Sequence, residues 1–309
     1  MRRLSLVIAA FNEEANIPRL YDRIAKIDWV ALELEIEIIF VDDHSRDGTP
    51  GILRNLAARD GRVKWLRFSR NFGSHKAFTA GLERATGDAA VILAADLQDP
   101  PETISQLVEK WRAGAKVVWA VRGTRHGEKR TNIVAARIYY LLMRRISVAE
   151  MPATGADFLL MDRRVLDALR AAPERHTSLL ALVQWMGFEQ ASIVYAKEAR
   201  TAGVSKWTFS KRLKLAVDSF VSFSYLPIRA MSVTGVGFAF FGFAYAGFLI
   251  VRRMLLLTPI EGWTSLISVV LITSGVQLIM LGVLGEYLWR AFDESRGRPR
   301  YIVEDSSEF

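Results

Sequence analysis

A short acidic stretch, AADLQDPP at residues 94–101, directly follows the apolar run of residues 89–93. The apolar run is typical of a buried strand, so Asp96, Gln98 and Asp99 are expected just beyond its carboxyl end. Carboxylate and amide oxygens are the ligands that hard divalent cations such as Mg²⁺ prefer. Asp and Pro also favour turns, so a turn without chemical duty is the alternative. The elements around this stretch must decide between the two.

Those elements alternate between strand and helix. The predicted strands lie at residues 4–10, 34–41, 63–68, 89–95 and 116–121, and the predicted helices lie near residues 15–26, 50–59, 75–85 and 101–113. A series of this kind predicts an α/β fold with a mostly parallel, doubly wound sheet. Ligands of such sheets bind beyond the carboxyl ends of the strands, so the chemistry is expected there.

Polar and charged residues follow each of the first four predicted strands. The segments are FNEE at residues 11–14, DDHSRDGT at 42–49, SRNFG at 69–73 and ADLQDPP at 95–101. We expect them to meet at one edge of the sheet. No strand is followed by a three-glycine dinucleotide fingerprint or by a glycine-rich loop that ends in Lys-Ser or Lys-Thr. NAD sites and P-loop chemistry are therefore poorly supported.

Two later segments indicate a membrane protein. Residues 230–251 and 264–285 carry no charged side chain, and each is long enough to cross a hydrocarbon core of about 30 Å. We predict two transmembrane helices, at about 230–251 and 264–288, with buried helices of a soluble protein as the alternative. Basic residues flank the pair on its outer sides, and the connecting loop has only Arg252 and Arg253. The bulk of the chain and its tail are therefore expected in the cytoplasm.

Composition limits the remaining choices. The chain has no cysteine, which excludes disulfides and thiolate metal sites. The net charge of +8 is assigned to the basic residues beside the lipid bilayer, since no nucleic-acid motif occurs. Apolar residues from Phe209 to Phe223 recur at spacings of four and three, which predicts an amphipathic helix at the lipid interface. Its alternative is a helix that packs on the soluble domain.

In this order along the chain, the motifs resemble family 2 glycosyltransferases of GT-A fold, and within them the polyprenyl-phosphate glycosyltransferases, most of all the bactoprenol glucosyltransferases of bacteria. The motifs are VIAAFNEEANI, VDDHSRDGT, SRNFG and ADLQDPPE, followed by TGADFLLMDRRVL, EARTAGVSKW, GEYLWR and RPRYIV. The resemblance implies a Rossmann-like catalytic domain at residues 1–205, amphipathic juxtamembrane helices at 206–228, a transmembrane hairpin at 229–290 and a cytoplasmic tail at 291–309.

The resemblance also implies a reaction. A sugar, in the first place glucose from UDP-glucose, would pass to the phosphate of a polyprenyl (undecaprenyl) phosphate with inversion at the anomeric carbon. It would do so on the cytoplasmic face of the bacterial inner membrane, for modification of cell-surface glycans such as lipopolysaccharide O-antigen. A homo-oligomer, with a tetramer as one form, is also implied. Two alternatives stay open: another sugar (N-acetylglucosamine, mannose or aminoarabinose), or a catalytically silent membrane scaffold.

The same resemblance assigns the donor site. The nucleotide-binding residues would be Ala10, Phe11, Asn12, Glu13, Asp42, Asp43, Arg70 and Asp96. Asp42 suits this role because a carboxylate can accept the imide N–H of uracil or a ribose hydroxyl. Asp96 and Gln98 would hold a Mg²⁺ or Mn²⁺ ion that bridges the diphosphate. Many relatives carry a further Asp where this chain has Ala94, which keeps the silent scaffold open, and Asp99 is expected to be a helix cap.

The acceptor site is assigned in the same way. A phosphate monoester carries about −1.5 to −2 charges near neutral pH, so it needs charge compensation more than deprotonation. Compensation would come from Arg122, Arg125, Arg137, Arg200 and Lys206, because guanidinium groups suit phosphate oxygens; a solvated surface charge is the alternative for each. Asp157, in TGAD, matches the family carboxylate near the reacting centre, to orient the acceptor or act as general base. With Asp96 it is the predicted catalytic residue.

Overall fold

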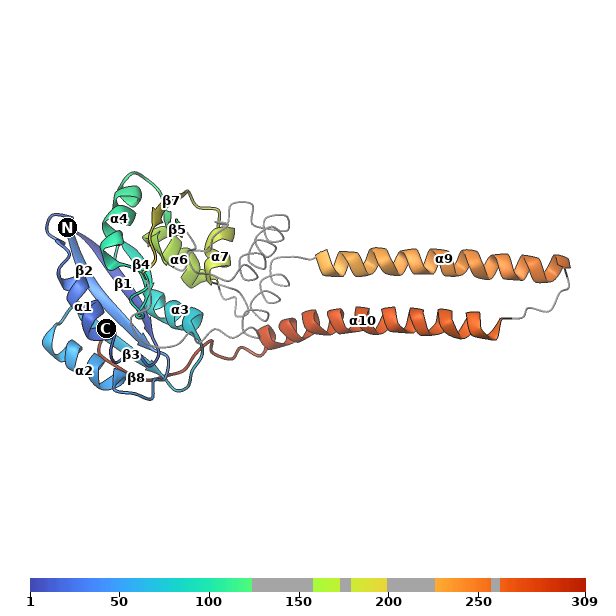
Figure 1. Cartoon of the computed structure of the whole chain (residues 1–309), viewed down its shortest axis with the longest axis horizontal. Coiled ribbons are helices and arrows are strands. Elements are labelled where there is room, and N and C mark those ends of the chain that lie inside the picture. Colours follow the sequence, from blue (N-terminus) through green and yellow to red (C-terminus); the bar gives the residue numbers. More distant parts are fainter. Residues whose placement is uncertain (124–157, 173–178, 199–225, 257–261) are drawn as a thin grey trace. The chain divides into compact units, whose positions relative to one another are not determined.

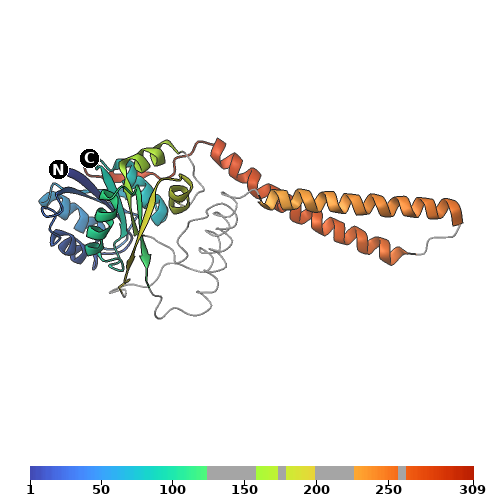
Figure 2. The ribbon, with the colours of Figure 1, turned by 90° about the horizontal axis from the view of Figure 1, so that it is seen from above.

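A computed structural model describes residues 1–123, 158–172, 179–198, 226–256 and 262–309 (Figure 1). The chain forms two units. The first comprises Met1–Ser219 together with Pro299–Phe309, and the second comprises Phe220–Arg298. Both termini of the chain belong to the first unit (Figures 1 and 2).

The first unit alternates strands and helices. In chain order the elements are β1 (Arg2–Ala10), α1 (Ile17–Ala25), β2 (Leu34–Asp42), α2 (Thr49–Arg59), β3 (Val63–Phe68), α3 (Ser74–Arg84), β4 (Ala89–Ala94), the 3₁₀ helix η1 (Pro101–Thr103), α4 (Ile104–Arg112), β5 (Val117–Arg122), β6 (Phe158–Asp162), α6 (Arg163–Ala171), α7 (Leu179–Trp185), β7 (Gln190–Tyr195) and β8 (Val303–Ser306). The five strands and four helices predicted from apolar patterning are all present, with ends shifted by a few residues. Strands β6, β7 and β8 were not predicted.

All eight described strands form one sheet, in the order β7-β5-β6-β4-β1-β2-β3-β8. Strands β4, β1, β2 and β3 are neighbours and run parallel, so their carboxyl ends lie at the same edge. Strand β6 runs antiparallel between β4 and β5, and β8 runs antiparallel to β3. The sheet is therefore mixed and mostly parallel, which confirms the predicted α/β class.

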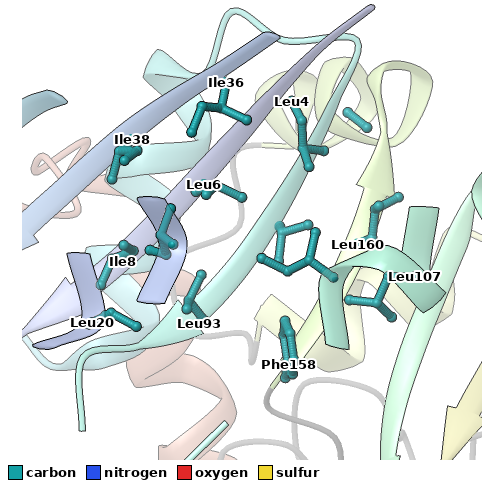
Figure 3. Close-up of a cluster of buried hydrophobic side chains, with 14 of the residues drawn as sticks. Leu4, Leu6, Ile8, Leu20, Ile36, Ile38, Leu93, Leu107, Phe158 and Leu160 are labelled. Carbon is teal, nitrogen blue, oxygen red and sulfur yellow. The ribbon is translucent and has the colours of Figure 1, made fainter. Parts of the chain in front are cut away.

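Helices cover both faces of the sheet, which explains the apolar character of the central strands. Leu4, Leu6 and Ile8 of β1 point to the face that α1, α2 and α4 cover, and all three are fully buried (Figure 3). Val7 points to the opposite face, which α3, α6 and α7 cover. A strand buried on both faces has a nearly continuous apolar sequence. On the second face α3 lies so close to β1 that a Cβ on Gly81 would meet a Val7 methyl at 2.3 Å.

The second unit contains two long helices, α9 (Leu226–Leu256) and α10 (Trp263–Ser295). Each holds a stretch that is long and apolar enough to cross a membrane, Ala230–Leu249 and Leu266–Ser295, and none of either stretch is buried in the protein. The helices extend beyond the spans predicted from sequence. Most of the predicted juxtamembrane segment, residues 206–228, lies outside the described residues.

Candidate functional site

Four parallel strands end side by side and carry the polar segments to one edge of the sheet. In the strand register Ala10 lies opposite Asp42, Ala9 lies opposite Ala94, and Asp42 lies opposite Arg67. The topology therefore brings to this edge the predicted donor-site residues Ala10, Phe11, Asn12, Glu13, Asp42, Asp43, Arg70, Asp96 and Gln98. Which of them contact a ligand stays a prediction.

Each of the four strand ends contains a residue with a left-handed backbone. The φ angles are 54° at Asn12 after β1, 65° at His44 after β2, 95° at Gly73 after β3 and 59° at Leu97 after β4. Among the described residues, Glu33 is the one other non-glycine residue with positive φ. Such a conformation costs a non-glycine residue about 1 to 3 kcal/mol and tends to occur at binding sites. The backbone conformations at this edge of the sheet thus lower the stability of the folded protein, which is typical of a ligand site.

The loops after β1 and β2 are joined by hydrogen bonds from backbone N–H groups to side-chain oxygens. The Asn12 N–H donates to the Ser45 hydroxyl at 2.8 Å, and the Arg46 N–H donates to Asn12 Oδ1 at 2.8 Å. The Glu13 N–H donates to the Thr49 hydroxyl at 3.0 Å. Asn tolerates the left-handed region better than most residues, and here its side-chain oxygen is held by Arg46 of the neighbouring loop. The conformation of Asn12 is therefore fixed by the neighbouring loop.

Asp42 is completely buried beneath these loops. One carboxylate oxygen accepts the Ser45 N–H at 2.9 Å, and the other lies 3.2 Å from Arg67 Nη1. Arg67 in turn donates from Nε to Glu304 of β8 at 3.0 Å. The structure thus gives both oxygens of Asp42 a partner within the protein, and a direct contact with a nucleotide stays a prediction.

Asp43 holds the loop after β3. It is 4% exposed and accepts the N–H groups of Phe72 and Gly73, at 2.6 and 2.8 Å. Burial, with a smaller contribution from the charge of Asp42, raises the pKa of Asp43 to about 6, although the two N–H groups oppose the rise. Arg70 is exposed on the same loop, with its guanidinium 4.4 Å from the centre of the Phe72 ring. Asp43 therefore places the predicted donor-site cation Arg70.

The loop after β4 carries the predicted metal ligands. Asp96 and Gln98 are half-buried and flank the buried, left-handed Leu97, and Asp96 Oδ1 accepts the Gln98 N–H at 3.2 Å. Within the described ranges, no group of three or more His, Asp or Glu side chains could hold a metal alone. One carboxylate and one amide oxygen nevertheless suit a Mg²⁺ or Mn²⁺ ion that takes its other ligands from a diphosphate and water. The residues fit a metal shared with a substrate.

Asp99 does not cap a helix, and this prediction is wrong. Neither η1 nor α4 has a side-chain cap hydrogen bond. Instead Asp99, 2% exposed, accepts a 2.5 Å hydrogen bond from the Tyr195 hydroxyl and lies 3.7 Å from Lys197 Nζ. The Glu198 N–H also donates to the Gln98 carbonyl at 2.9 Å. The loop after β4 is therefore attached to the end of β7, a contact between residues 96 positions apart that no local pattern indicates.

The predicted acceptor-site residues are described only in part. Arg122 ends β5, which runs in the same direction as β4 because both are antiparallel to β6, so its backbone lies at the same sheet edge. The other predicted acceptor and catalytic residues fall outside the described residues: Arg125, Arg137, Asp157, Arg200 and Lys206. Their roles stay predictions.

Comparisons with known proteins give related sequences along the whole chain. A model of glycosyl transferase family 2 matches residues 5–170, more than half of the chain. YkcC of Bacillus subtilis (strain 168), described as an uncharacterized glycosyltransferase, is 39% identical over 302 residues, which cover 98% of this chain and 93% of that protein. The bactoprenol glucosyl transferase of Shigella phage SfV is 37% identical over 306 residues, 99% of either chain.

Among solved structures, similarity is more remote. Glucosyl-3-phosphoglycerate synthase from Mycobacterium tuberculosis, in complex with Mn²⁺, UDP-glucose and phosphoglyceric acid, aligns with a TM-score of 0.47 and 17% identity, over 70% of this chain and 76% of that one. This likeness is too remote to carry an argument about ligands.

Proposed function

The chain belongs to glycosyl transferase family 2 and is a glycosyltransferase, and we propose that it transfers glucose from UDP-glucose to the phosphate of a polyprenyl phosphate, with inversion at the anomeric carbon. The observation that carries this proposal is the extent of the likeness to the phage SfV bactoprenol glucosyl transferase. That likeness covers 99% of both chains, and so includes the strand-end segments and both apolar helices. A lipid acceptor is consistent with two helices that are long and apolar enough to cross a membrane.

In this proposal the nucleotide binds across the ends of β1, β2 and β3. The strained backbone at Asn12 and the neighbouring backbone of Ala10, Phe11 and Glu13 form one wall. The buried carboxylates of Asp42 and Asp43 mainly hold the loops that contact the nucleotide, since each already binds backbone N–H groups of a loop. Arg70 is exposed and offers a planar, permanently charged group to phosphate oxygens. Affinity therefore depends on how firmly the loops are held.

The sugar diphosphate lies toward the end of β4 in the same proposal. Asp96 and Gln98 would hold a Mg²⁺ or Mn²⁺ ion, which neutralises the charge of the leaving nucleoside diphosphate when bound. An oxygen of the acceptor phosphate forms the new bond to the anomeric carbon while the bond from that carbon to the diphosphate breaks, and the electron pair leaves with UDP. The acceptor is already ionised, so Asp157 serves chiefly to orient it.

The charge of the acceptor phosphate requires cations on the chain. We assign this compensation to Arg122, Arg125, Arg137, Arg200 and Lys206. We also propose a bacterial inner membrane location with the first unit in the cytoplasm, supported by the basic residues outside the two apolar helices. A homo-oligomer stays a prediction.

The test is a transfer assay with the purified full chain in detergent. Labelled UDP- and GDP-sugars are offered with undecaprenyl phosphate in the presence of Mg²⁺, Mn²⁺ or a chelator. We expect a lipid-linked product from UDP-glucose that is lost with the chelator and in Asp96→Ala. Asp22→Ala, which removes an exposed carboxylate from α1, is the matched control and should keep full activity. A product from a different donor alone would replace glucose with that sugar.

One observation favours a second candidate, the catalytically silent scaffold. Ala94, half-buried at the end of β4, occupies the position at which the family resemblance implies a further carboxylate. Nucleotide binding without transfer from any donor would favour the scaffold over the enzyme. A large gain of turnover in Ala94→Asp, from a level near zero, would support it further.

A further inference from the structure

The segment after α10 returns to the sheet beside the loops of the candidate site. Strand β8 pairs with β3, with Leu66 opposite Ser306 and Arg67 opposite Asp305, and the register shifts between Arg67 and Phe68. The Ser69 N–H also donates to the Ile302 carbonyl at 3.0 Å. The tail thus borders the strand whose end carries Arg70 and the residues that Asp43 holds.

Glu304 of β8 forms an ion pair with Arg67 of β3 and lies near His44 of the loop after β2. Its carboxylate lies 3.0 Å from Arg67 Nε and 3.7 Å from His44 Nδ1. Arg67 reaches Asp42 with a different nitrogen, at 3.2 Å. Asp42 in turn fixes the Ser45 backbone, and the Ser45 hydroxyl accepts the Asn12 N–H. A continuous series of contacts therefore runs from the tail to the strained end of β1.

A second series of contacts runs through aromatic rings to the loop after β3. The Tyr301 ring stacks on Phe68, with 5.0 Å between ring centres, and Phe68 meets Phe72 edge-on at 5.5 Å. The Phe72 N–H is one of the two donors to Asp43. The hydroxyl of Tyr301 contacts Glu83, and burial is the largest cause that raises the pKa of Tyr301 to about 12. Tyr301 is therefore neutral at physiological pH, and it contributes ring packing to this second series of contacts and no charge.

We propose that Glu304 is a positioning residue of the donor site, which acts through Arg67 and Asp42 on the loop after β2. The inference rests on the proposed function, because it assumes that this loop binds the nucleotide. Arg67 is 18% exposed and lies between two carboxylates, so its side chain is held from both ends. Without the charge of Glu304, Arg67 keeps only Asp42 as an ionic partner among its described contacts, and the Asp42–Ser45 turn loses its outer support.

The neighbouring residue supplies a matched control. Asp305 pairs with Arg54 of α2 at 2.9 Å and is 45% exposed, against 49% for Glu304. Both residues belong to β8 and both make an exposed ion pair, but the Asp305 pair does not involve the loops of the candidate site. Glu304→Gln and Asp305→Asn therefore remove equivalent charges from one strand, and only the first affects the series of contacts that reaches Asn12.

The experiment measures UDP binding in the presence of Mn²⁺ by titration calorimetry on the full chain in detergent, together with transfer kinetics. We expect Glu304→Gln to weaken UDP binding and to raise the KM for the nucleotide sugar, each about three- to fivefold, with kcat at saturation unchanged. Loss of an exposed ion pair changes an equilibrium constant by at most about this factor. Asp305→Asn should leave both values unchanged. Glu304→Asp, which keeps the charge on a shorter side chain, should recover part of the loss.

The outcomes separate the two proposals. Equal UDP affinity in Glu304→Gln and Asp305→Asn, with normal binding by the unaltered chain, would overturn the role of Glu304 and leave the proposed function intact. A fall in kcat alone would also overturn it, since positioning of the donor loop changes KM. Absence of UDP binding by the unaltered chain would overturn the donor site itself and the role of Glu304 with it. Thermal unfolding of both variants is recorded in parallel, and equal midpoints are expected.

Discussion

The substitution Asp43→Asn tests whether buried charge organises the donor loops. The carboxylate is 4% exposed and accepts two backbone N–H groups, from Phe72 and Gly73. Asn has nearly the same shape and no charge, but only one of its two terminal atoms can accept a hydrogen bond. One of the two N–H groups would then face an amide NH₂ and lose its partner.

Two opposing contributions set the expected stability. The rise of the Asp43 pKa from 3.8 to about 6 corresponds to about 3 kcal/mol. The folded protein holds the proton more strongly than the unfolded chain, so this cost of the ionised form is absent below about pH 4 and complete above about pH 6. Asp43→Asn removes that cost but leaves one buried N–H group without an acceptor, a loss of about 1 to 3 kcal/mol. The free energy of unfolding at pH 7.5 should therefore change by less than about 2 kcal/mol.

Nucleotide affinity should fall, because the loop that carries Arg70 loses one of its two attachments to Asp43. A loss of about 1.4 kcal/mol in loop order corresponds to tenfold weaker binding, so UDP affinity at pH 7.5 should fall at least about tenfold. At pH 5 Asp43 is mostly protonated in the unaltered chain, which should then resemble the variant. Stability and affinity thus change independently.

The assay is calorimetric UDP titration with Mn²⁺ at pH 7.5 and pH 5, with thermal unfolding at both values. The ratio of affinities between the unaltered chain and the variant removes the titration of UDP itself. We expect a ratio of at least about ten at pH 7.5 that approaches one at pH 5. An equal ratio at both pH values would refute the role of the ionised carboxylate, and equal affinities throughout would refute the role of Asp43 altogether.

Two further substitutions test the metal loop and the packing of the sheet. Tyr195→Phe removes the hydroxyl that binds Asp99, so we expect the Mn²⁺ concentration for half-maximal transfer to rise about fivefold and stability to fall about 1 to 2 kcal/mol; an unchanged metal requirement would show that Asp99 does not shape the loop. Gly81→Ala places a methyl 2.3 Å from Val7 Cγ1, so the free energy of unfolding should fall about 1 to 3 kcal/mol in denaturant titration, with UDP affinity unchanged. An unchanged unfolding midpoint would mean that α3 shifts freely.

The central strands were predictable because their environment is simple. Strands β1 to β5 have mostly buried side chains. They therefore appear in the sequence as apolar runs, and turn residues lie between these runs. Strand β8 has the sequence VEDS and lies at the sheet edge, so its side chains give no apolar pattern. Its partner β3 lies more than two hundred residues earlier. Strand β6 lies within the TGADFLLMDRRVL segment, but its antiparallel place between β4 and β5 depends on long-range pairing that local sequence does not indicate.

The same limit applies to the candidate site. The rule that parallel strands end at a common edge correctly placed the polar strand-end segments together. It did not indicate which atoms each side chain contacts. Asp43 binds backbone N–H groups some thirty positions away, and Asp99 binds Tyr195 on a strand that apolar patterning had not revealed. Residue types in the sequence indicate chemistry, whereas partners are set by the fold.

The place of β8 in the sheet has a consequence for synthesis of the protein. A ribosome makes β1 to β7 first, then α9 and α10, and β8 after both. Until then the edge of β3 is unpaired, and an unpaired strand edge can pair with other chains and cause aggregation. A chain that crosses a bilayer an even number of times returns to the side from which it left, and β8 can join β3 only on that side. In the proposed membrane arrangement, completion of the sheet is thus a late step that follows insertion of α9 and α10.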